Sequence, residues 1–358
     1  MCEGCVRCAS TPRHPAPDAP QHLTHPCTST SGTRAPRHPM KIPYEEFDLS
    51  DVRTYPLESR KSKAHVEAFA SPYHEGAGVP GLLGSLPSML AANDFKSVVA
   101  AILAARQADT PIIWGIGAHV LKTGLSPILI DLMERGFVSA VATNGAGIIH
   151  DFEIALSGAT SEDVDTSLGP GLFGMAEETG TELNEAINQG VRDGLGLGQS
   201  VARHLAQRNA RHARYSVAAT AWRLEIPLTV HVAIGTDIIH MHPLASGAAL
   251  GEGSLRDFKY FTSAVSRLAG GVYINCGSAV VLPEVFLKAI ALARNQGVSL
   301  SGLTTVNIEF LRHYRPITNV VTRPTARIGH GYAITGHHEL LLPLLAAALI
   351  EGGASQGP

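Results

Sequence analysis

The sequence of 358 residues has no apolar run of the roughly 18 residues that a transmembrane helix needs. Its first ten residues, MCEGCVRCAS, lack the apolar segment of a secretory signal peptide. The 28 Lys and Arg residues against 31 Asp and Glu residues give a net charge of −3, without the basic excess that general nucleic-acid binding requires. These absences predict a cytoplasmic protein that binds neither membranes nor nucleic acids.

Cysteine is scarce, and its placement is uneven. Four of the five cysteines lie in residues 1–39, at Cys2, Cys5, Cys8 and Cys27. That stretch is rich in Pro, Ser, Thr, His and Arg, so we expect a disordered leader. An alternative is an over-extended gene start, with Met40 as the true first residue. The C-x2-C-x2-C spacing suits zinc or iron–sulfur ligation, although a chance cluster is the simpler explanation. The remaining Cys276 excludes a disulfide framework and fits a reducing compartment.

The body of the chain alternates between short, largely apolar runs, the first three of which end in Gly, and amphipathic stretches. The runs predict buried parallel strands at 111–117, 138–147, 226–235, 270–278 and 301–310. The stretches predict helices at 95–107, capped by Asp94, and at 126–136, 182–209, 283–297 and 339–353. This alternation predicts an α/β fold with a doubly wound, mostly parallel, Rossmann-like sheet. We expect a loop and helix segment over residues 40–110, then one α/β domain over residues 111–353.

Ligands of such sheets bind beyond the carboxyl ends of the strands, so the residues that follow each predicted strand are the candidates for a binding site. Small and polar residues follow several strands and predict a binding cleft there. They are Ala118, His119, Lys122, Asn144, Gly145, Ala146, His150, Asp237, His240 and His242. His231 lies within a predicted strand, so we expect it to be a core residue.

The standard dinucleotide fingerprint is absent. Gly115-Ile116-Gly117 opens a strand-to-helix turn, but no third Gly follows at the required spacing. The turn after the second strand reads Asn144-Gly145 and carries no ribose-binding acid. No G-x-S-x-G nucleophile motif and no Walker motif occur either.

A divalent metal site is an alternative interpretation of the same edge. Asp237, His240 and His242 put three possible zinc or iron ligands within six residues. Seventeen histidines in one chain make chance clusters common, and no complete metal-binding motif of the HExxH type occurs.

Taken in order from Ile112 to Ala348, these segments resemble deoxyhypusine synthase. The resemblance lies in WGIGAHVLKTGLSPILIDLMERGFVSAVATNGAGIIHDFEIAL, SVAATAWRLEIPLTVHVAIGTD, GEGSLRDFKYF, YINCGSAVVLP and HHELLLPLLAAAL. It implies a parallel doubly wound sheet, NAD bound in a non-standard way, a polyamine or other small amine as substrate, and assembly into a dimer or homotetramer. It also implies that residues from Ala118 to Lys122 and from Asn144 to Ala146 line NAD. Asp237 or Glu252 would take the first acidic position and Asp257 the second, holding cofactor ribose and substrate amine.

The departures from that family concern the chemistry. The family's lysine nucleophile lies in an S-W-G-K segment, and the matching stretch here, Asn319 to Pro324, has no lysine. No lysine follows Lys288, which we expect to be a solvent-exposed residue of a helix. Arg323 cannot replace the lysine, because a guanidinium stays protonated. The family's catalytic histidine is replaced by the neighbourhood of Glu284, and its carboxylate pair after the second strand by Ile149-His150.

We therefore expect a transferase or oxidoreductase of deoxyhypusine synthase type that binds NAD but does not transfer efficiently to a protein lysine. His150, Asp257 and Glu284 are the candidate general acids or bases. Two alternatives stay open: a metal-dependent enzyme on the same scaffold, and a non-catalytic binding or assembly module.

Overall fold

The computed structural model describes residues 44–354. The chain divides into two compact units, Met1–Lys61 and Ser62–Pro358. The described part of the first unit contains the short 3-10 helix η1 (Leu57–Ser59). All strands of the described residues belong to the second unit. The expectations for the leader at 1–39, its cysteines and Met40 lie outside the described residues.

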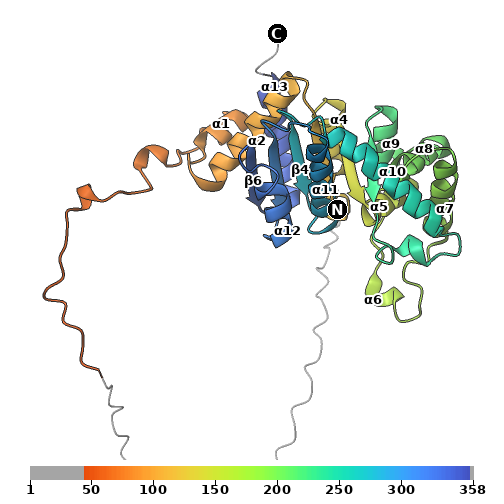
Figure 1. The fold of residues 1–358 in the computed structure, drawn as a ribbon, viewed down its shortest axis with the longest axis horizontal. Helices are drawn as coiled ribbons and strands as arrows, with labels where there is room; N and C mark the ends of the chain where they lie inside the picture. The colour runs from red at the N-terminus through yellow and green to blue at the C-terminus, as the bar shows by residue number, and fades with distance from the viewer. Residues whose placement is uncertain (1–43, 355–358) are drawn as a thin grey trace, which may run out of the picture. The chain divides into compact units, whose positions relative to one another are not determined.

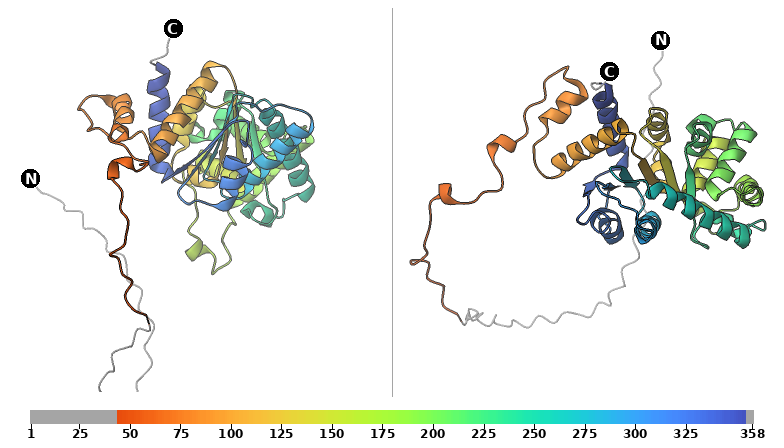
Figure 2. Two further views of the ribbon diagram at one scale, coloured as in Figure 1. Left: turned by 60° about the vertical axis from the view of Figure 1, so that its left-hand side comes forward. Right: turned by 45° about the horizontal axis from the view of Figure 1, so that its top comes forward.

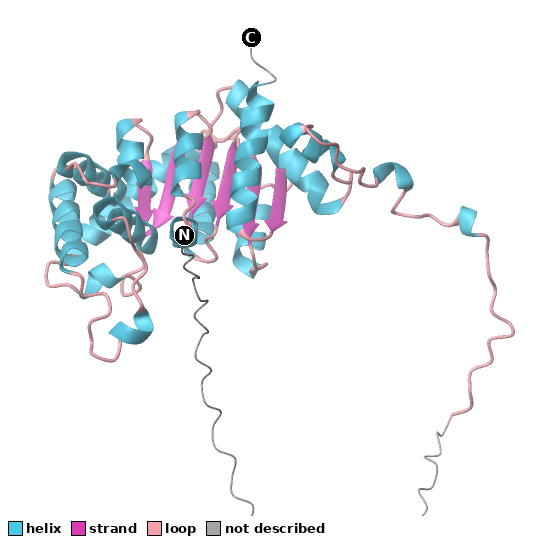
Figure 3. Ribbon diagram, turned by 180° about the vertical axis from the view of Figure 1, so that it is seen from behind, coloured by secondary structure: helices cyan, strands magenta, loops and turns pink. Residues whose placement is uncertain are grey.

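The second unit is built on a six-stranded sheet of strand order β3-β2-β1-β4-β5-β6. Every neighbouring pair is parallel, and Figure 3 shows the arrows pointing the same way. The strands are β1 (Ile112–Ile116), β2 (Ala140–Asn144), β3 (Leu228–His231), β4 (Val272–Cys276), β5 (Thr304–Glu309) and β6 (His330–Thr335). Because the chain runs outward from β1 in one direction and from β4 in the other, the sheet is doubly wound, as the sequence predicts.

Helices connect the strands and cover both faces of the sheet (Figures 1 and 2). The longer helices are α1 (Gly78–Ser85), α2 (Leu90–Gln107), α4 (Ser126–Glu134), α5 (Gly145–Ser157), α7 (Glu177–Arg192), α8 (Leu197–Arg208), α10 (Gly247–Val265), α11 (Val281–Asn295) and α13 (His338–Ala354). The shorter ones are α3 (Ala118–Lys122), α6 (Val164–Ser167), α9 (Val217–Arg223), α12 (Tyr314–Pro316), η2 (Val66–Ala68), η3 (Ala213–Tyr215), η4 (Ile238–Met241) and the π-helix η5 (Ile317–Thr322).

The two-residue period of the strands divides their side chains between two cores. Trp114 of β1 packs in one core with Ile102 of α2 and Leu345 of α13. Its neighbour Ile113 packs in the other core with Phe286 of α11. Strands buried on both faces are rich in apolar and β-branched residues, which is why the sequence located β1 to β5. No helix within residues 44–354 is long and apolar enough to span a membrane.

Side chains of α10 cover the free edge of β3. The backbone N–H of Val230 donates to Oδ2 of Asp257 (2.8 Å), and the N–H of Val232 donates to Oγ of Ser254 (3.3 Å). The Ser254 hydroxyl in turn donates to the carbonyl of Val230 (3.3 Å). Edge-strand groups that would otherwise face solvent are therefore paired within the chain.

At the centre of the sheet, the turns that follow β1 and β4 touch. The N–H of Gly117 donates to the carbonyl of Cys276 (2.8 Å). A Cβ added at Gly117 would lie 1.9 Å from the carbonyl oxygen of Gly277, so only glycine fits there. This contact lies where the strand order reverses, the place at which open α/β sheets bind ligands.

The structure differs from the sequence prediction in several elements, and α1, α5 and α10 are helices that the predicted ranges do not include. Asp94 lies inside α2, which begins at Leu90, and is not its cap. The helix expected over 182–209 is two helices, because the chain turns at Gly194, where φ is +85°. The sequence prediction also missed β6, an edge strand that is only partly buried and lacks a continuous apolar run.

Candidate functional site

A cavity of about 420 Å³ opens at the carboxyl ends of β2 and β3. The segment with α6 that projects from this edge in Figure 1 forms part of its wall. Four residues that the sequence predicts for the site line the cavity, together with two glutamates that it does not. They are Lys122, Ala146, His150 and Asp237, and Glu153 and Glu162. Three carboxylates therefore face one ammonium group and one imidazole.

Asp237 lies at the beginning of α5, directly against Gly145. A Cβ at Gly145 would lie 2.0 Å from Oδ2 of Asp237. Burial raises the pKa of Asp237. This pKa is lowered by the charge of His240 and by hydrogen bonds from the Thr236 side chain and the backbone N–H of Ala146, but burial has the larger effect. The segment after β3 therefore supplies a carboxylate at the turn after β2, where the sequence shows none.

His240 lies beside Asp237 and carries an unpaired donor. Its Nδ1 accepts from the N–H of Gly235 (3.1 Å) and from that of Asp237 (3.4 Å). The proton of the neutral ring is then on Nε2, which is buried, has no partner and lies 4.0 Å from Oδ2 of Asp237. A buried donor next to a carboxylate suits a vicinal diol, in which each hydroxyl can both donate and accept.

His150 lies on α5 and faces the same cavity. Its Nδ1 is 2.7 Å from Oγ1 of Thr160, and the Thr160 hydroxyl makes a short hydrogen bond to Oε2 of Glu153. Burial lowers the pKa of His150; Glu153 opposes this shift and Lys122 adds to it. The imidazole is therefore largely neutral at neutral pH, the form that can accept a proton.

The other residues predicted to bind cofactor lie close to this edge. The Asn144 side chain accepts the N–H of Gly147 (2.8 Å) and caps α5. Ala118 begins α3, directly after the turn at Gly117. His119 is exposed and points toward the other half of the sheet, where its ring contacts those of Phe310 (centroids 5.9 Å apart) and His338 (5.3 Å).

The structure does not bring Asp257 to the cavity. It is fully buried, where its Oδ2 accepts the N–H groups of Gly198 (2.9 Å) and Val230 (2.8 Å) and so joins the beginning of α8 to β3. Burial raises the pKa of Asp257 to about 7. This geometry favours a structural role over the predicted contact with substrate, because a side chain bound to two backbone segments cannot reach a ligand.

Glu284 and Glu252 also lie apart from the cavity. Glu284 accepts from Asn319 (2.8 Å) and pairs with Lys288 and Arg315, and the hydrogen bond from Lys288 lowers its pKa most. Lys288 is exposed, as predicted. Glu252 pairs with Arg256 on the solvent side of α10 (2.6 Å). Of the two acids that the sequence left open for the first acidic position, Asp237 is the one at the site.

The geometry also argues against the metal alternative. Nε2 of His242 lies 3.0 Å from the carbonyl of Gly174, so this ring is engaged away from Asp237 and His240. Within residues 44–354 there is no group of three or more His, Cys, Asp or Glu side chains that could hold a metal ion. Spacing in the sequence could not show this, because it does not fix where each ring points. His231, by contrast, is a core residue as predicted, with its Nε2 3.1 Å from the Thr229 hydroxyl.

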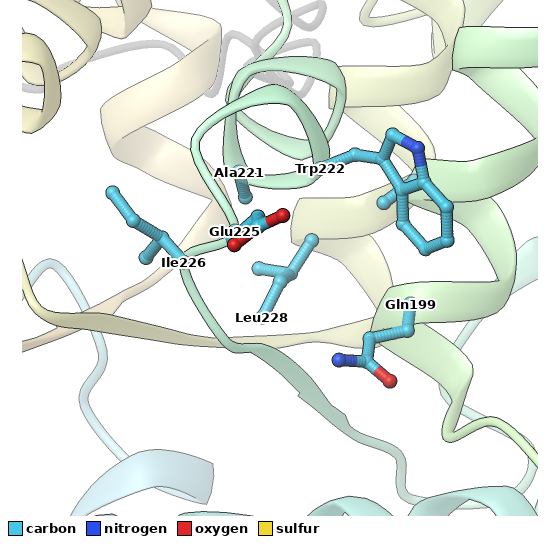
Figure 4. Close-up of a pocket in the computed structure, with 7 residues that line it drawn as sticks. Gln199, Ala221, Trp222, Glu225, Ile226 and Leu228 are labelled. Carbon is cyan, nitrogen blue, oxygen red and sulfur yellow. The ribbon is translucent and has the colours of Figure 1, made fainter.

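A second hollow, of about 330 Å³, lies at the amino ends of the strands, opposite the carboxyl ends where the first cavity opens (Figure 4). Leu228, the first residue of β3, lines it together with Trp222, Glu225 and Gln199. It therefore lies at the amino end of the strand, whereas ligands of parallel α/β sheets bind at the carboxyl end. We place the candidate site in the cavity beside Asp237.

Sequence reasoning missed Glu153, Thr160, Glu162 and Thr179. Glu153 follows His150 by three residues in one helix, a spacing that puts both side chains on one face and could have revealed the pair. Thr160 and Thr179 come from outside α5, and no local pattern points to them.

Comparison with protein-family models finds no match, and none is found among curated protein sequences. Solved structures do match. AgrE, in its complex with ornithine and NAD⁺, aligns with a TM-score of 0.50 and 17% identity over 73% of this chain and 33% of its own. An LOR/SDH protein from Methanococcus maripaludis S2 aligns with a TM-score of 0.47 and 16% identity over 72% and 69% of the two chains. A structure assigned as a deoxyhypusine synthase, from Entamoeba histolytica, aligns with a TM-score of 0.45 and 12% identity over 79% and 96%.

At these identities the likeness concerns the fold alone. The chain has a Rossmann-like α/β fold, with a parallel sheet flanked by helices. Its structural neighbours include enzymes, among them the arginine dihydrolase ArgZ from cyanobacteria. The chain spans about a third of the length of AgrE and of ArgZ.

Proposed function

We propose that this protein is an NAD-dependent enzyme of deoxyhypusine synthase type that acts on a polyamine or another small amine. The observation that carries this proposal is the cavity at the ends of β2 and β3, where Asp237, Glu153 and Glu162 outnumber Lys122. Such an excess of carboxylates attracts a cationic amine and repels an anionic substrate. AgrE, a structural neighbour whose structure contains ornithine and NAD⁺, agrees with an amine and NAD on a related fold.

The residues present fit NAD at this edge. Asp237 and the unpaired Nε2–H of His240 offer an acceptor and a donor to a ribose diol. Lys122 offers a positive charge to a phosphate. When bound, NAD⁺ accepts a hydride from the carbon that carries the amine. Because the amine is held at the carboxylates, the reacting end of the dinucleotide belongs at the β2–β3 side of the sheet.

The chain's own residues would then bind the ammonium group and remove its proton. Glu162 would hold the cation, Glu153 adds negative charge beside it, and His150 is the base within the cavity. Transfer of an aminobutyl group to a protein lysine is not part of the proposal. The stretch that should carry the amine nucleophile has Asn319 at its start, and that side chain binds Glu284.

Isothermal titration calorimetry with NAD⁺ and with spermidine or ornithine tests the binding. The formation of reduced cofactor on mixing tests the chemistry. Binding without reduced cofactor would contradict an oxidation step, and absence of all binding would favour the binding or assembly module. A borohydride-trapped adduct between protein and spermidine would show that some lysine does form an imine.

Self-association into a dimer or tetramer, with a small molecule as the other partner, stays a prediction. Native mass spectrometry measures it directly, and it reports any retained dinucleotide or metal in the same spectrum. A stoichiometric metal would revive the alternative based on Asp237 and His240.

A further inference from the structure

His150 is tied to Glu153 through the hydroxyl of Thr160. The direct distance between Nδ1 of His150 and Oε2 of Glu153 is 3.9 Å, too long for a hydrogen bond. Thr160 closes the gap, since its Oγ1 lies 2.7 Å from Nδ1 and also binds Oε2. The other oxygen of Glu153, Oε1, accepts from the hydroxyl of Thr179 (3.0 Å). Both carboxylate oxygens are thus fixed by hydroxyl groups.

The direction of the protons follows from the donors available. A hydroxyl has one proton, and Thr160 donates it to Glu153. Its lone pair must then accept from His150, so Nδ1 carries the ring proton and Nε2 carries the lone pair. Within residues 44–354, Nε2 of His150 has no hydrogen-bond partner, and the residue lines the cavity.

We propose that Glu153 and Thr160 are positioning residues that hold His150 as the Nδ1–H tautomer, so that Nε2 is the base for the amine in the cavity. This inference rests on the proposed function for its substrate. Its structural part, the tautomer, depends only on the hydrogen bonds of the three side chains.

The step balances in protons and electrons. The substrate enters as an ammonium ion, R–CH₂–NH₃⁺, and one N–H proton passes to Nε2 of His150, which becomes imidazolium. With NAD⁺ bound as the hydride acceptor, the resulting neutral amine would be able to give up a hydride from its CH₂ group, which would leave an iminium ion and reduced cofactor. Glu153, reached through Thr160, stabilises the positive ring that forms, in the way a carboxylate orients and supports a catalytic histidine.

The charges around His150 set the direction of its pH dependence. Lys122 of α3 faces the ring from one side, Glu153 lies on the same helix, and Glu162 and Asp237 line the rest of the cavity. Burial and Lys122 lower the pKa of His150, and Glu153 raises it. Removing the charge of Glu153 should therefore move the acid limb of the rate profile to lower pH.

The test compares T160V, which removes the bridging hydroxyl at nearly constant volume, with T160S, which keeps it. Nitrogen-15 NMR of the imidazole reports the tautomer in the whole protein without any ligand. We expect the Nδ1–H form in the wild type and in T160S, and a mixture with the Nε2–H form in T160V. We also expect T160V to lower kcat for spermidine or ornithine oxidation about 100-fold, with little change in KM, since general-base catalysis contributes about 100-fold or more.

Two further variants complete the test. E153Q should shift the acid limb of kcat downward, and T262V, which removes a threonine hydroxyl bonded to a backbone carbonyl of α10, should change neither the tautomer nor the profile. An Nε2–H tautomer in the wild type, or equal behaviour of T160V and T160S, would overturn the proposal. Calorimetry with NAD⁺ and amine separates a failure of the proposed function from a failure of this inference. Absence of binding would contradict the proposed function, whereas the tautomer measurement still decides whether Glu153 and Thr160 position His150.

Discussion

The carboxylate of Asp237 rests against the bare Cα of Gly145, and a single methyl group there would lie 2.0 Å from its Oδ2. Two segments far apart in the sequence, the turn after β2 and the segment after β3, thus build one corner of the cavity. The glycine is required because the carboxylate occupies the space of its missing side chain.

Gly145→Ala should therefore act like a substitution of Asp237 itself. We expect G145A and D237N each to weaken NAD⁺ binding about tenfold or more, because a hydrogen bond to a charged group contributes about 1.5–3 kcal/mol. The measurement is calorimetry with NAD⁺. The control is Gly251→Ala in α10, where an added Cβ meets nothing within 4 Å. Unchanged affinity in G145A would mean that Asp237 does not hold the cofactor.

Substitutions of Asp257 should separate a structural role from a catalytic one. D257N keeps an oxygen that can accept the N–H groups of Gly198 and Val230, so we expect a small change in the free energy of unfolding and nearly unchanged turnover. D257A leaves two buried N–H groups unpaired and should cost about 3 kcal/mol or more. Urea denaturation measures the first quantity and an NAD-linked assay the second. A folded D257N protein without activity would restore the catalytic assignment.

His231 and Asp257 should influence stability in opposite directions over the same pH range. Burial lowers the pKa of His231 to about 4, so stability present above its ordinary pKa of 6.5 is lost as pH falls toward 4. Asp257 has its pKa raised from 3.8 to about 7, so the stability it contributes at low pH is lost as pH rises through 7. Each effect amounts to about 3–4 kcal/mol over its full range.

The two effects oppose each other in the wild type, and single variants should reveal them. With H231Q, the free energy of unfolding should fall as pH rises from about 4 to 7, and with D257N it should rise over that range. Denaturant titrations at several pH values give both slopes. H74Q, which changes an exposed histidine, serves as the control. Equal slopes in all variants would contradict the burial of these two groups.

Gly117→Ala should disrupt the centre of the sheet. Its Cβ would lie 1.9 Å from the backbone oxygen of Gly277, and a backbone atom between two strands cannot move away at low cost. We expect a loss of about 3 kcal/mol or more, comparable to overpacking of a core. Thermal unfolding measures it, with G251A as the matched substitution in a site with free space. A melting temperature equal to that of G251A would show that the two turns are further apart.

The sequence was sufficient for most of the fold because the central strands are buried on both faces. Runs such as the one containing Trp114 are apolar throughout and end in glycine. The edge strand β6 escaped prediction because half-exposed residues such as Tyr332 give no continuous apolar signal. Strand-end reasoning likewise located Lys122, His150 and Asp237, since carboxyl ends of parallel strands converge at one edge.

The sequence could not predict where individual side chains point. Asp257 and Glu252 lie five residues apart in α10, yet one is fully buried against β3 and the other points to solvent. His242 belongs to a plausible ligand triplet, yet its ring binds the carbonyl of Gly174. These outcomes depend on how helices and loops pack, which only the assembled structure determines.

The pairing of β3 with α10 has a consequence for how the molecule meets other chains. The N–H groups of Val230 and Val232 are already bonded to Asp257 and Ser254. An incoming peptide therefore cannot pair with these N–H groups at the edge of the sheet. Strand exchange and fibril-like stacking are thereby blocked on that side. Asp257 and Ser254 of α10 thus protect this edge of the sheet against pairing with a strand from another copy of the chain.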